Sequence, residues 1–213
     1  MAKQYRGCKD LVYAVLQKDT AEELTYGTVK PLAPCKSVSM TFEQESEQVF
    51  ADNAAQIIVN GAGKSTKTFE VMAIDPAVVA ELTGQDIITV GTGETAKKVI
   101  VTRSGAVAPY VAIGYKLFDT DSDTTPCEYV WCFKGKVKFP DKTSATIDDS
   151  TTSNGQTVEV EFVETLHKFE KITSKDGAVD MALPHLGEGF DMTKWDAQVV
   201  TPDNFETILK KAN

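Results

Sequence analysis

The chain has 213 residues, of which 42% are hydrophobic, enough to build one substantial core or two small ones. Aspartate and glutamate total 31 against 22 lysines and arginines, so the formal net charge is -9. This excess disfavours tight binding to DNA or RNA, because such binding depends on cationic side chains that displace counterions from phosphates. The N-terminal residues are not followed by an apolar stretch of signal-peptide length, and no segment has the length of a membrane span, so we expect synthesis in the cytoplasm.

Strand patterns begin early in the chain. We expect strands at residues 11–16 and 37–43, and in the second of these apolar and polar side chains alternate, as in a half-buried strand. The apolar positions are Val38, Met40 and Phe42, and the polar positions are Ser39, Thr41 and Glu43. The acidic stretch 43–48 that follows, which includes Glu45 and Glu47, is expected to form a polar loop or an extension of the strand.

Residues 59–66, VNGAGKST, contain part of the phosphate-binding signature G-x-x-x-x-G-K-[ST]. The first glycine of that signature would fall at Ile58, and the signature also requires a helix after it. The residues that follow alternate with a period of two instead, which predicts a strand. Its apolar positions are Phe69 and Val71, and its polar positions are Thr68 and Glu70. We therefore favour a strand over a nucleotide site, with Asn60-Gly61 as a hairpin turn.

Two helices are predicted. Residues 75–84 combine an aspartate suited to the N-cap, a proline at the first helical position and a glycine after the last one. A second helix is possible from about Pro202 to Lys211, with Phe205, Ile208 and Leu209 on one side, and we expect it to pack against the body or a neighbour.

Further strands are expected at residues 98–102, 110–118, 128–134, 135–139 and 157–162. The segment 141–156, which includes Asp148 and Asp149, is polar and rich in Ser, Thr and Asp, so it is expected to be a long hairpin tip. Residues 119–123 begin like a calcium loop, but Thr124 and Val130 occupy the positions that need glycine and glutamate. A turn between two strands is the better interpretation.

The sequence offers little support for catalysis. Its two histidines, His167 and His185, leave little room for a Ser-His-Asp triad or a multi-histidine metal site. The four cysteines lack the paired spacing of a zinc site and are expected to be free thiols: Cys8, Cys35, Cys127 and Cys132. We therefore expect no enzyme activity, no metal and no cofactor.

The order of several segments resembles the major tail tube proteins of long-tailed bacteriophages with non-contractile tails, in the branch common among phages of Gram-positive hosts. The resemblance spans about residues 5 to 180, whereas the role of the extension from about 181 is not assigned. The segments that carry it are YRGCKDLVYA (5–14), LTYG (24–27), the strand 38–42, VFADN (49–53), the predicted helix 75–84, APYVA (108–112) and YVWCFKGKVKF (129–139).

This resemblance implies a mainly β fold, an antiparallel sandwich or barrel with a short flanking helix, as a single domain over residues 1–213. It implies hexameric rings stacked into a virion tail tube through which genomic DNA passes without specific binding. The implied partners are other copies of the chain, a tape measure protein, and tail terminator and tip proteins, with no membrane.

Under the resemblance, specific residues become candidates for the channel and for ring contacts. The candidates for the wall that faces the channel are Ser39, Thr41 and Glu43 on one strand, or Thr68 and Glu70 on another. An acidic channel would repel DNA and so prevent adhesion. The candidates for contacts between rings are Glu45, Glu47, Asp148 and Asp149.

Three other interpretations stay open. The same tube could belong to a tail-like bacteriocin rather than to an infectious phage. A β-sandwich module that binds a cell surface or carbohydrate is a second class, for which Trp131 and Trp195 are the aromatic candidates. An enzyme that uses residues 61–66 as a phosphate loop is the third.

Overall fold

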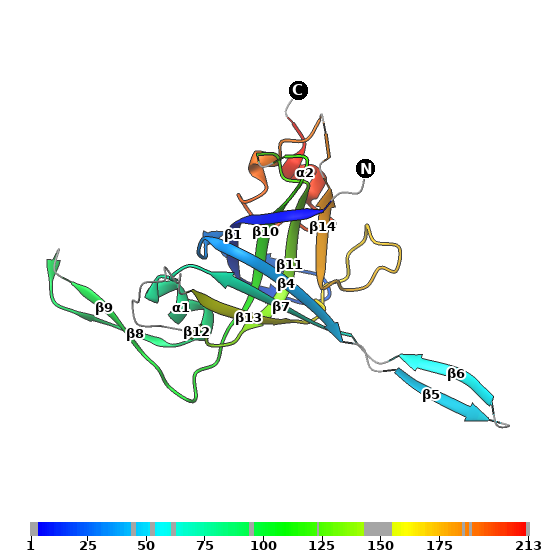
Figure 1. The fold of residues 1–213 in the computed structure, drawn as a ribbon, viewed down its shortest axis with the longest axis horizontal. Helices are drawn as coiled ribbons and strands as arrows, with labels where there is room; N and C mark the ends of the chain where they lie inside the picture. The colour runs from blue at the N-terminus through cyan, green and yellow to red at the C-terminus, as the bar shows by residue number, and fades with distance from the viewer. Residues whose placement is uncertain are drawn as a thin grey trace, which may run out of the picture.

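A computed structural model describes residues 4–43, 46–51, 54–60, 63–93, 96–122, 124–142, 155–184, 186–187 and 189–211. The described chain is mainly antiparallel β, and one large sheet dominates it (Figure 1). The order along this sheet is β2-β1-β10-β11-β13-β7-β4, with β3 beside β1, β12 beside β13 and β14 beside β11. Its strands are β1 (Tyr5–Asp19), β2 (Leu24–Tyr26), β3 (Lys30–Pro31), β4 (Cys35–Glu43), β7 (Lys64–Val71), β10 (Tyr110–Asp119), β11 (Glu128–Val137), β12 (Asp141–Lys142), β13 (Gln156–Phe162) and β14 (Asp180–Pro184).

The large sheet curls around its own hydrophobic core. Strand β4, at one end of the strand order, comes to lie against β1 near the other end. Side chains from both ends and from the middle of the sheet meet inside, including Tyr13, Phe69, Ile113 and Phe162, each at most 1% exposed. The curvature therefore lets a single sheet enclose a core without a second sheet packed on top of it.

Helix α1 (Pro76–Thr83) closes one end of this core, as the sequence predicted. The side chain of Asp75 accepts a hydrogen bond from the backbone N–H of Ala77, which caps the N-terminus. Gly84 ends the helix in the left-handed conformation, with a φ of 68°. Val79 and Leu82 project from the helix into the core and are buried. The structure confirms the predicted helix, with its N-cap, its first-turn proline and its terminal glycine. All these signals lie within ten residues of one another.

A second core lies on the outer side of β1, β10 and β11, beneath the C-terminal segment. Trp131 and Phe133 of β11 are covered by Phe169, Trp195 and residues around Leu209. This covering segment contains a 3-10 turn, η2 (Met192–Lys194), and the helix α2 (Phe205–Leu209). The predicted second helix is thus shorter than expected, and it packs against the body of its own chain.

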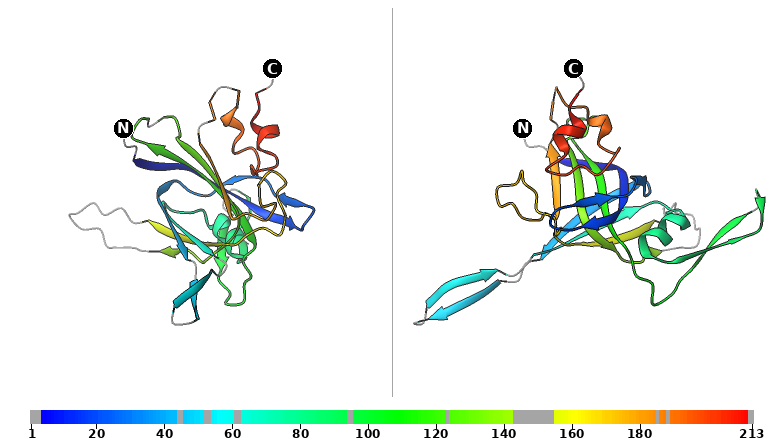
Figure 2. Two further views of the ribbon diagram at one scale, coloured as in Figure 1. Left: turned by 90° about the vertical axis from the view of Figure 1, so that its right-hand side faces the viewer. Right: turned by 180° about the vertical axis from the view of Figure 1, so that it is seen from behind.

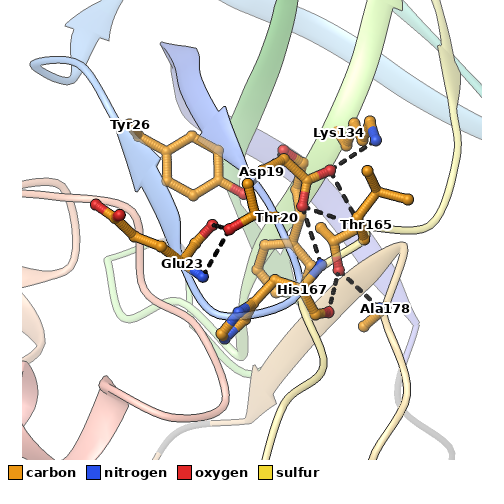
Figure 3. Close-up of polar contacts among 10 residues, drawn as sticks. Asp19, Thr20, Glu23, Tyr26, Lys134, Thr165, His167 and Ala178 are labelled. Atoms are coloured by element: carbon orange, nitrogen blue, oxygen red, sulfur yellow. Dashed lines mark hydrogen bonds and ion pairs between the residues drawn. The ribbon is translucent and has the colours of Figure 1, made fainter.

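A buried ion pair within the sheet holds the loop that leads to this C-terminal part (Figure 3). The carboxylate of Asp19, at the end of β1, lies 2.6 Å from the ammonium of Lys134 on β11, and the two side chains are only 7% and 11% exposed. The same carboxylate accepts hydrogen bonds from the backbone N–H groups of Leu166, at 2.9 Å, and His167, at 3.0 Å. Nearby, the hydroxyl of Thr165 donates to the carbonyl of His167 and accepts from the N–H of Ala178. Asp19 therefore fixes the start of the loop that leads to the second core.

Two hairpins project from opposite sides of the body, as both figures show (Figures 1 and 2). One consists of β5 (Ser46–Ala51) and β6 (Ala54–Asn60), and the other of β8 (Asp86–Val90) and β9 (Lys97–Val101). Each is a separate two-stranded sheet. We call them the β5–β6 arm and the β8–β9 arm.

Two expectations about local structure need correction, and one open alternative is decided. The turn expected at Asn60-Gly61 is not supported at Asn60, because this residue lies in β6, paired with Ser46 of β5, and the pairing of the two strands continues to Ala51 and Ala54. Of the two alternatives for the acidic stretch 43–48, the strand holds for residue 43 and for residues 46–48, since β4 ends at Glu43 and β5 begins at Ser46. The two strands expected at 128–134 and 135–139 are one strand, β11. Gly135 does not interrupt it, because the missing side chain makes room there for the ring of Phe162.

Candidate functional site

The two strand faces that were alternative candidates for a channel wall are one continuous face. Strands β4 and β7 are antiparallel neighbours, and their register places Ser39 opposite Thr68. Directly opposed residues in a sheet point to the same side, so the polar positions of both strands share that side. Within this surface Ser37 donates a hydrogen bond to the carboxylate of Glu70, at 3.0 Å.

This surface continues across β13 onto β11. Glu159 of β13 lies opposite Thr68 of β7, and Glu161 lies opposite both Thr66 of β7 and Lys136 of β11. We define the polar face as these positions together with Lys138, which follows β11 and contacts Glu159 and Glu161. Its members are Ser37, Ser39, Thr41, Glu43, Lys64, Thr66, Thr68, Glu70, Lys136, Lys138, Thr157, Glu159 and Glu161.

The polar face carries four glutamates and three lysines, so its formal charge is one negative unit. Two of the lysines contact glutamates of the same face. Lys64 lies 3.1 Å from Glu161, and Lys138 lies 3.0 Å from Glu161 and also contacts Glu159. Hydrogen bonds from Lys138 and then Lys64 lower the pKa of Glu161 below its ordinary value. The acidic surface expected from the net charge is therefore only weakly acidic on this face, and much of its positive charge is internally paired.

The opposite side of β7 holds a buried charge that the sequence did not reveal. Lys67, in register between Met40 and Val160, points inward and its side chain is 2% exposed. Its ammonium lies 2.6 Å from the carboxylate of Asp180 and 3.3 Å from the hydroxyl of Tyr115. Burial alone would lower the pKa of Lys67, but Cys132, Tyr115 and Asp180 outweigh it, and the pKa is raised. Lys67 and Asp180 line a cavity of about 570 Å³ between β1, β4, β10, β11 and β14.

The distal half of β4 leaves its apolar positions open to solvent. Val38 packs against the first core, as expected, but Met40 is 60% exposed and Phe42 is 58% exposed. The expected burial of these two residues is wrong, because β4 runs past the end of the core and opposes Lys67 and Ser65 there. The ring of Phe42 instead lies over Gly63, where a Cβ would come within 2.1 Å of it.

The contact between Phe42 and Gly63 explains the glycine at position 63, which the chain shares with phosphate-binding loops. Gly63 precedes a strand, as the alternating pattern predicted, and its missing side chain makes room for Phe42. Lys64 belongs to the polar face and contacts Glu161. Ser65 is buried. Residues 63–65, the described part of the motif, therefore have structural roles in or beside a sheet rather than in a strand-loop-helix phosphate site.

The β8–β9 arm carries an apolar stripe. The pairs Ile88–Val99 and Val90–Lys97 lie on one face of the two-stranded sheet, because alternate residues of a strand point to the same side. Ile88, Val90 and Val99 are 52%, 58% and 45% exposed. On the other face Ile100 packs against the first core. The stripe is thus the uncovered side of an arm whose base is attached to the body.

Of the four residues predicted to form contacts between rings, the structure describes Glu47 alone. Glu45, Asp148 and Asp149, as well as His185, lie outside the described residues. Glu47 lies in β5, paired with Val59. The segment 141–156 does begin and end as a hairpin, since Asp141 pairs with Thr157.

The observations bear directly on the other classes of function. Trp131 and Trp195 are both completely buried, so neither forms an exposed aromatic platform for carbohydrate. Among the described residues, no group of three or more His, Cys, Asp or Glu side chains is placed to hold a metal ion. None of the helices in the described part of the chain is long and apolar enough to cross a membrane. A comparison of the sequence with known protein families gives no match, and a comparison with curated proteins gives none either.

Proposed function

We propose that the chain is a structural subunit of a tube, of the kind that forms the tail of a long-tailed bacteriophage with a non-contractile tail. Hexameric rings would stack into the tube, and the polar face would line the channel through which genomic DNA leaves. The observation that carries this proposal is the single polar face that crosses four adjacent strands while the first core lies behind it. The same architecture would serve a tail-like bacteriocin.

The chemistry of the polar face suits a channel for DNA. Its hydroxyl groups hold water, and its glutamates repel phosphates. Adhesion of DNA requires cations that displace counterions from the backbone. Lys64 and Lys138 contact glutamates of their own face, which weakens their attraction for phosphate. Duplex DNA would therefore move along this wall without being held.

Two exposed features suit contacts between subunits. Within the part of the chain that the structure describes, strand β4 has a ladder on one side only, with β7, and it carries the exposed side chains of Met40 and Phe42. Edge strands and exposed apolar groups favour association, and a closed ring covers them. The stripe on the β8–β9 arm offers a second apolar contact. In this proposal the partners are further copies of the chain, together with a tape measure protein and the terminator and tip proteins of the tail.

Assembly of the purified chain tests the proposal. We expect rings or hollow tubes by negative-stain electron microscopy at high protein concentration, and a matching rise in mass by light scattering. If the chain needs an initiator, adding tail-tip components should produce tubes. A monomer at every concentration, with and without tip components, would contradict the proposal.

A pair of matched variants tests the arm. Ile88→Asp places a charge on the apolar stripe, whereas Thr89→Asp places the same charge at the next residue, on the other face of the arm. We expect the first to reduce assembly at least about tenfold and the second to have little effect, with both monomers folded, because a desolvated carboxylate at an interface costs several kcal/mol. Equal effects of the two variants would show that the stripe is not part of the interface.

The orientation of the wall has its own test. A cryo-EM reconstruction of the tubes should place Thr68 and Glu159 on the inner surface. Finding them on the outer surface would overturn the channel assignment and leave the tube itself standing.

A further inference from the structure

Two exposed apolar features lie on opposite sides of the body. Strand β4 leads toward the β5–β6 arm and carries the exposed side chains of Met40 and Phe42. The apolar stripe lies on the β8–β9 arm, which projects from the other side (Figures 1 and 2). Because one chain holds the two features apart, they meet only between different copies of the chain.

A lysine extends the apolar stripe toward the tip of the β8–β9 arm. Lys97 is paired with Val90 and therefore shares the face of the stripe. Among the described residues no ion pair involves Lys97. At the base of the same face, the carboxylate of Asp86 lies 2.6 Å from the guanidinium of Arg103 and is neutralised by it. The rest of the arm holds Lys97 and Lys98 against one glutamate, so the stripe ends in a positive charge.

The exposed part of β4 ends in the opposite charge. Glu43 follows Phe42 directly and is the last residue of the strand. It begins the acidic stretch 43–48, which contains three glutamates and no cation. Lys64, opposite Glu43 in the ladder with β7, contacts Glu161 instead. The order along β4 is thus apolar and then negative, and the order along the stripe is apolar and then positive.

We propose that the stripe of the β8–β9 arm docks on the exposed end of β4 in a second copy of the chain. In this contact Lys97 faces the acidic stretch 43–48 of that copy. Among the described residues β4 has no ladder on its outer edge, so the flexible stem of the lysine can pass that edge to reach Glu43. Opposite charges fix the register of the contact, and apolar side chains that leave water stabilise it.

The two surfaces differ, so the contact runs head to tail from copy to copy. Contacts of this kind generate a ring when the rotation between copies closes. The inference rests on the proposed function, in which the partners are further copies of the chain, and it names the two surfaces that meet.

A mixture of two blocked variants tests the pairing. Ile88→Asp blocks the arm and keeps β4 intact, whereas Met40→Asp blocks β4 and keeps the arm intact. Each variant alone should associate at least about tenfold more weakly than the parent. An equal mixture should form a dimer of one copy each by sedimentation velocity, because one intact arm then meets one intact β4. Thr89→Asp and Thr41→Asp carry the same charge on the other face of each element, and each should associate like the parent.

An exchange of charges tests the register independently and disturbs no apolar contact. Lys97→Glu should raise the concentration needed for association about threefold to tenfold, because an attraction becomes a repulsion. Adding Glu43→Lys to the same chain should restore most of the loss. The control Lys98→Glu makes the same change in net charge on the other face of the arm, opposite Thr89, so Glu43→Lys should not rescue it.

The outcomes separate this pairing from the tube. A mixture that stays monomeric, or a charge exchange without rescue, overturns the pairing, and tubes formed by the parent would then leave the proposed function standing. Dimers in the mixture, with no ring or tube from the parent even when tip components are added, support the pairing and contradict the tube. A parent and a mixture that are both monomeric under every condition contradict both.

Discussion

Asp19→Asn offers a quantitative test of how the C-terminal part of the chain is held. The asparagine keeps the size of the side chain and one oxygen that can accept from the N–H groups of Leu166 and His167. It removes the negative charge that lies 2.6 Å from the ammonium of Lys134, in a pair whose members are 7% and 11% exposed. Removing one partner of a buried pair costs about 3–5 kcal/mol, because the other charge stays buried without compensation. With part of the hydrogen bonding kept, we expect a loss near the lower limit, about 3 kcal/mol of unfolding free energy.

The matched control lies on the same strand. Asp10 contacts Lys116 at 2.7 Å, but its side chain is 54% exposed. Asp10→Asn should therefore cost only about 0–1 kcal/mol, as exposed ion pairs do. Urea unfolding of both variants beside the parent gives the two values. Equal losses in the two variants would refute the reasoning, because the carboxylate of Asp19 is buried and that of Asp10 is exposed.

The same residue should shape the response to acid. Burial alone would raise the pKa of Asp19, but hydrogen bonds from Lys134 and from the backbone N–H groups of Leu166 and His167 outweigh it and lower the pKa below its ordinary value of 3.8. A carboxyl group with a lowered folded-state pKa stabilises the fold fully above its unfolded value, and this contribution is lost as pH falls through the folded-state pKa. We expect the unfolding free energy of Asp19→Asn to fall less steeply than that of the parent in the acid range. Parallel curves would contradict this.

Five more variants, in three comparisons, test the structure by unfolding measurements. Gly84→Ala should lower the unfolding free energy by at least about 1–2 kcal/mol, because φ is 68° and the new Cβ would lie 2.2 Å from the carbonyl oxygen of Val107. The control Gly105→Ala, which has open space around it, should change the unfolding free energy by less than about 0.5 kcal/mol. Trp195→Ala should cost about 3–5 kcal/mol, because it empties the centre of the second core, and a loss below about 1 kcal/mol would refute that packing. Asp180→Asn should cost more than Lys67→Met, because the first leaves a buried ammonium unpaired while the second leaves a carboxylate that is 35% exposed, and the reverse order would contradict the buried pair.

The sequence predicts those parts of the fold whose causes lie close together in the chain. Helix α1 is one example, since Asp75, Pro76 and Gly84 are sufficient to begin and end it. The alternation in β4, β7 and β13 is another, because a period of two indicates a strand whatever its partners are. For the same reason the polar face could be predicted strand by strand.

Contacts between distant parts of the chain could not be predicted in this way. Lys67 looks like a surface residue until Asp180 is found beside it, 113 residues later. The position of Asn60 depends on the pairing of β5 with β6, which places Asn60 opposite Ser46 and outweighs its local preference for a turn. Each of these features requires the register of strands, and one sequence does not determine register.

Strand β4 links the pattern in the sequence to the proposed assembly. Its alternation is that of a strand with one buried face, but in the single chain Val38 is half-buried against the first core while Met40 and Phe42 are exposed. Fully burying an apolar side chain of this size contributes about 1.5–3 kcal/mol of free energy. Covering both exposed side chains in an interface would therefore favour association. The polar positions of the same strand face the other way and join the polar face. In β4 one side is polar and the other side carries exposed apolar residues. This arrangement is expected in a wall whose second layer comes from the neighbouring subunit.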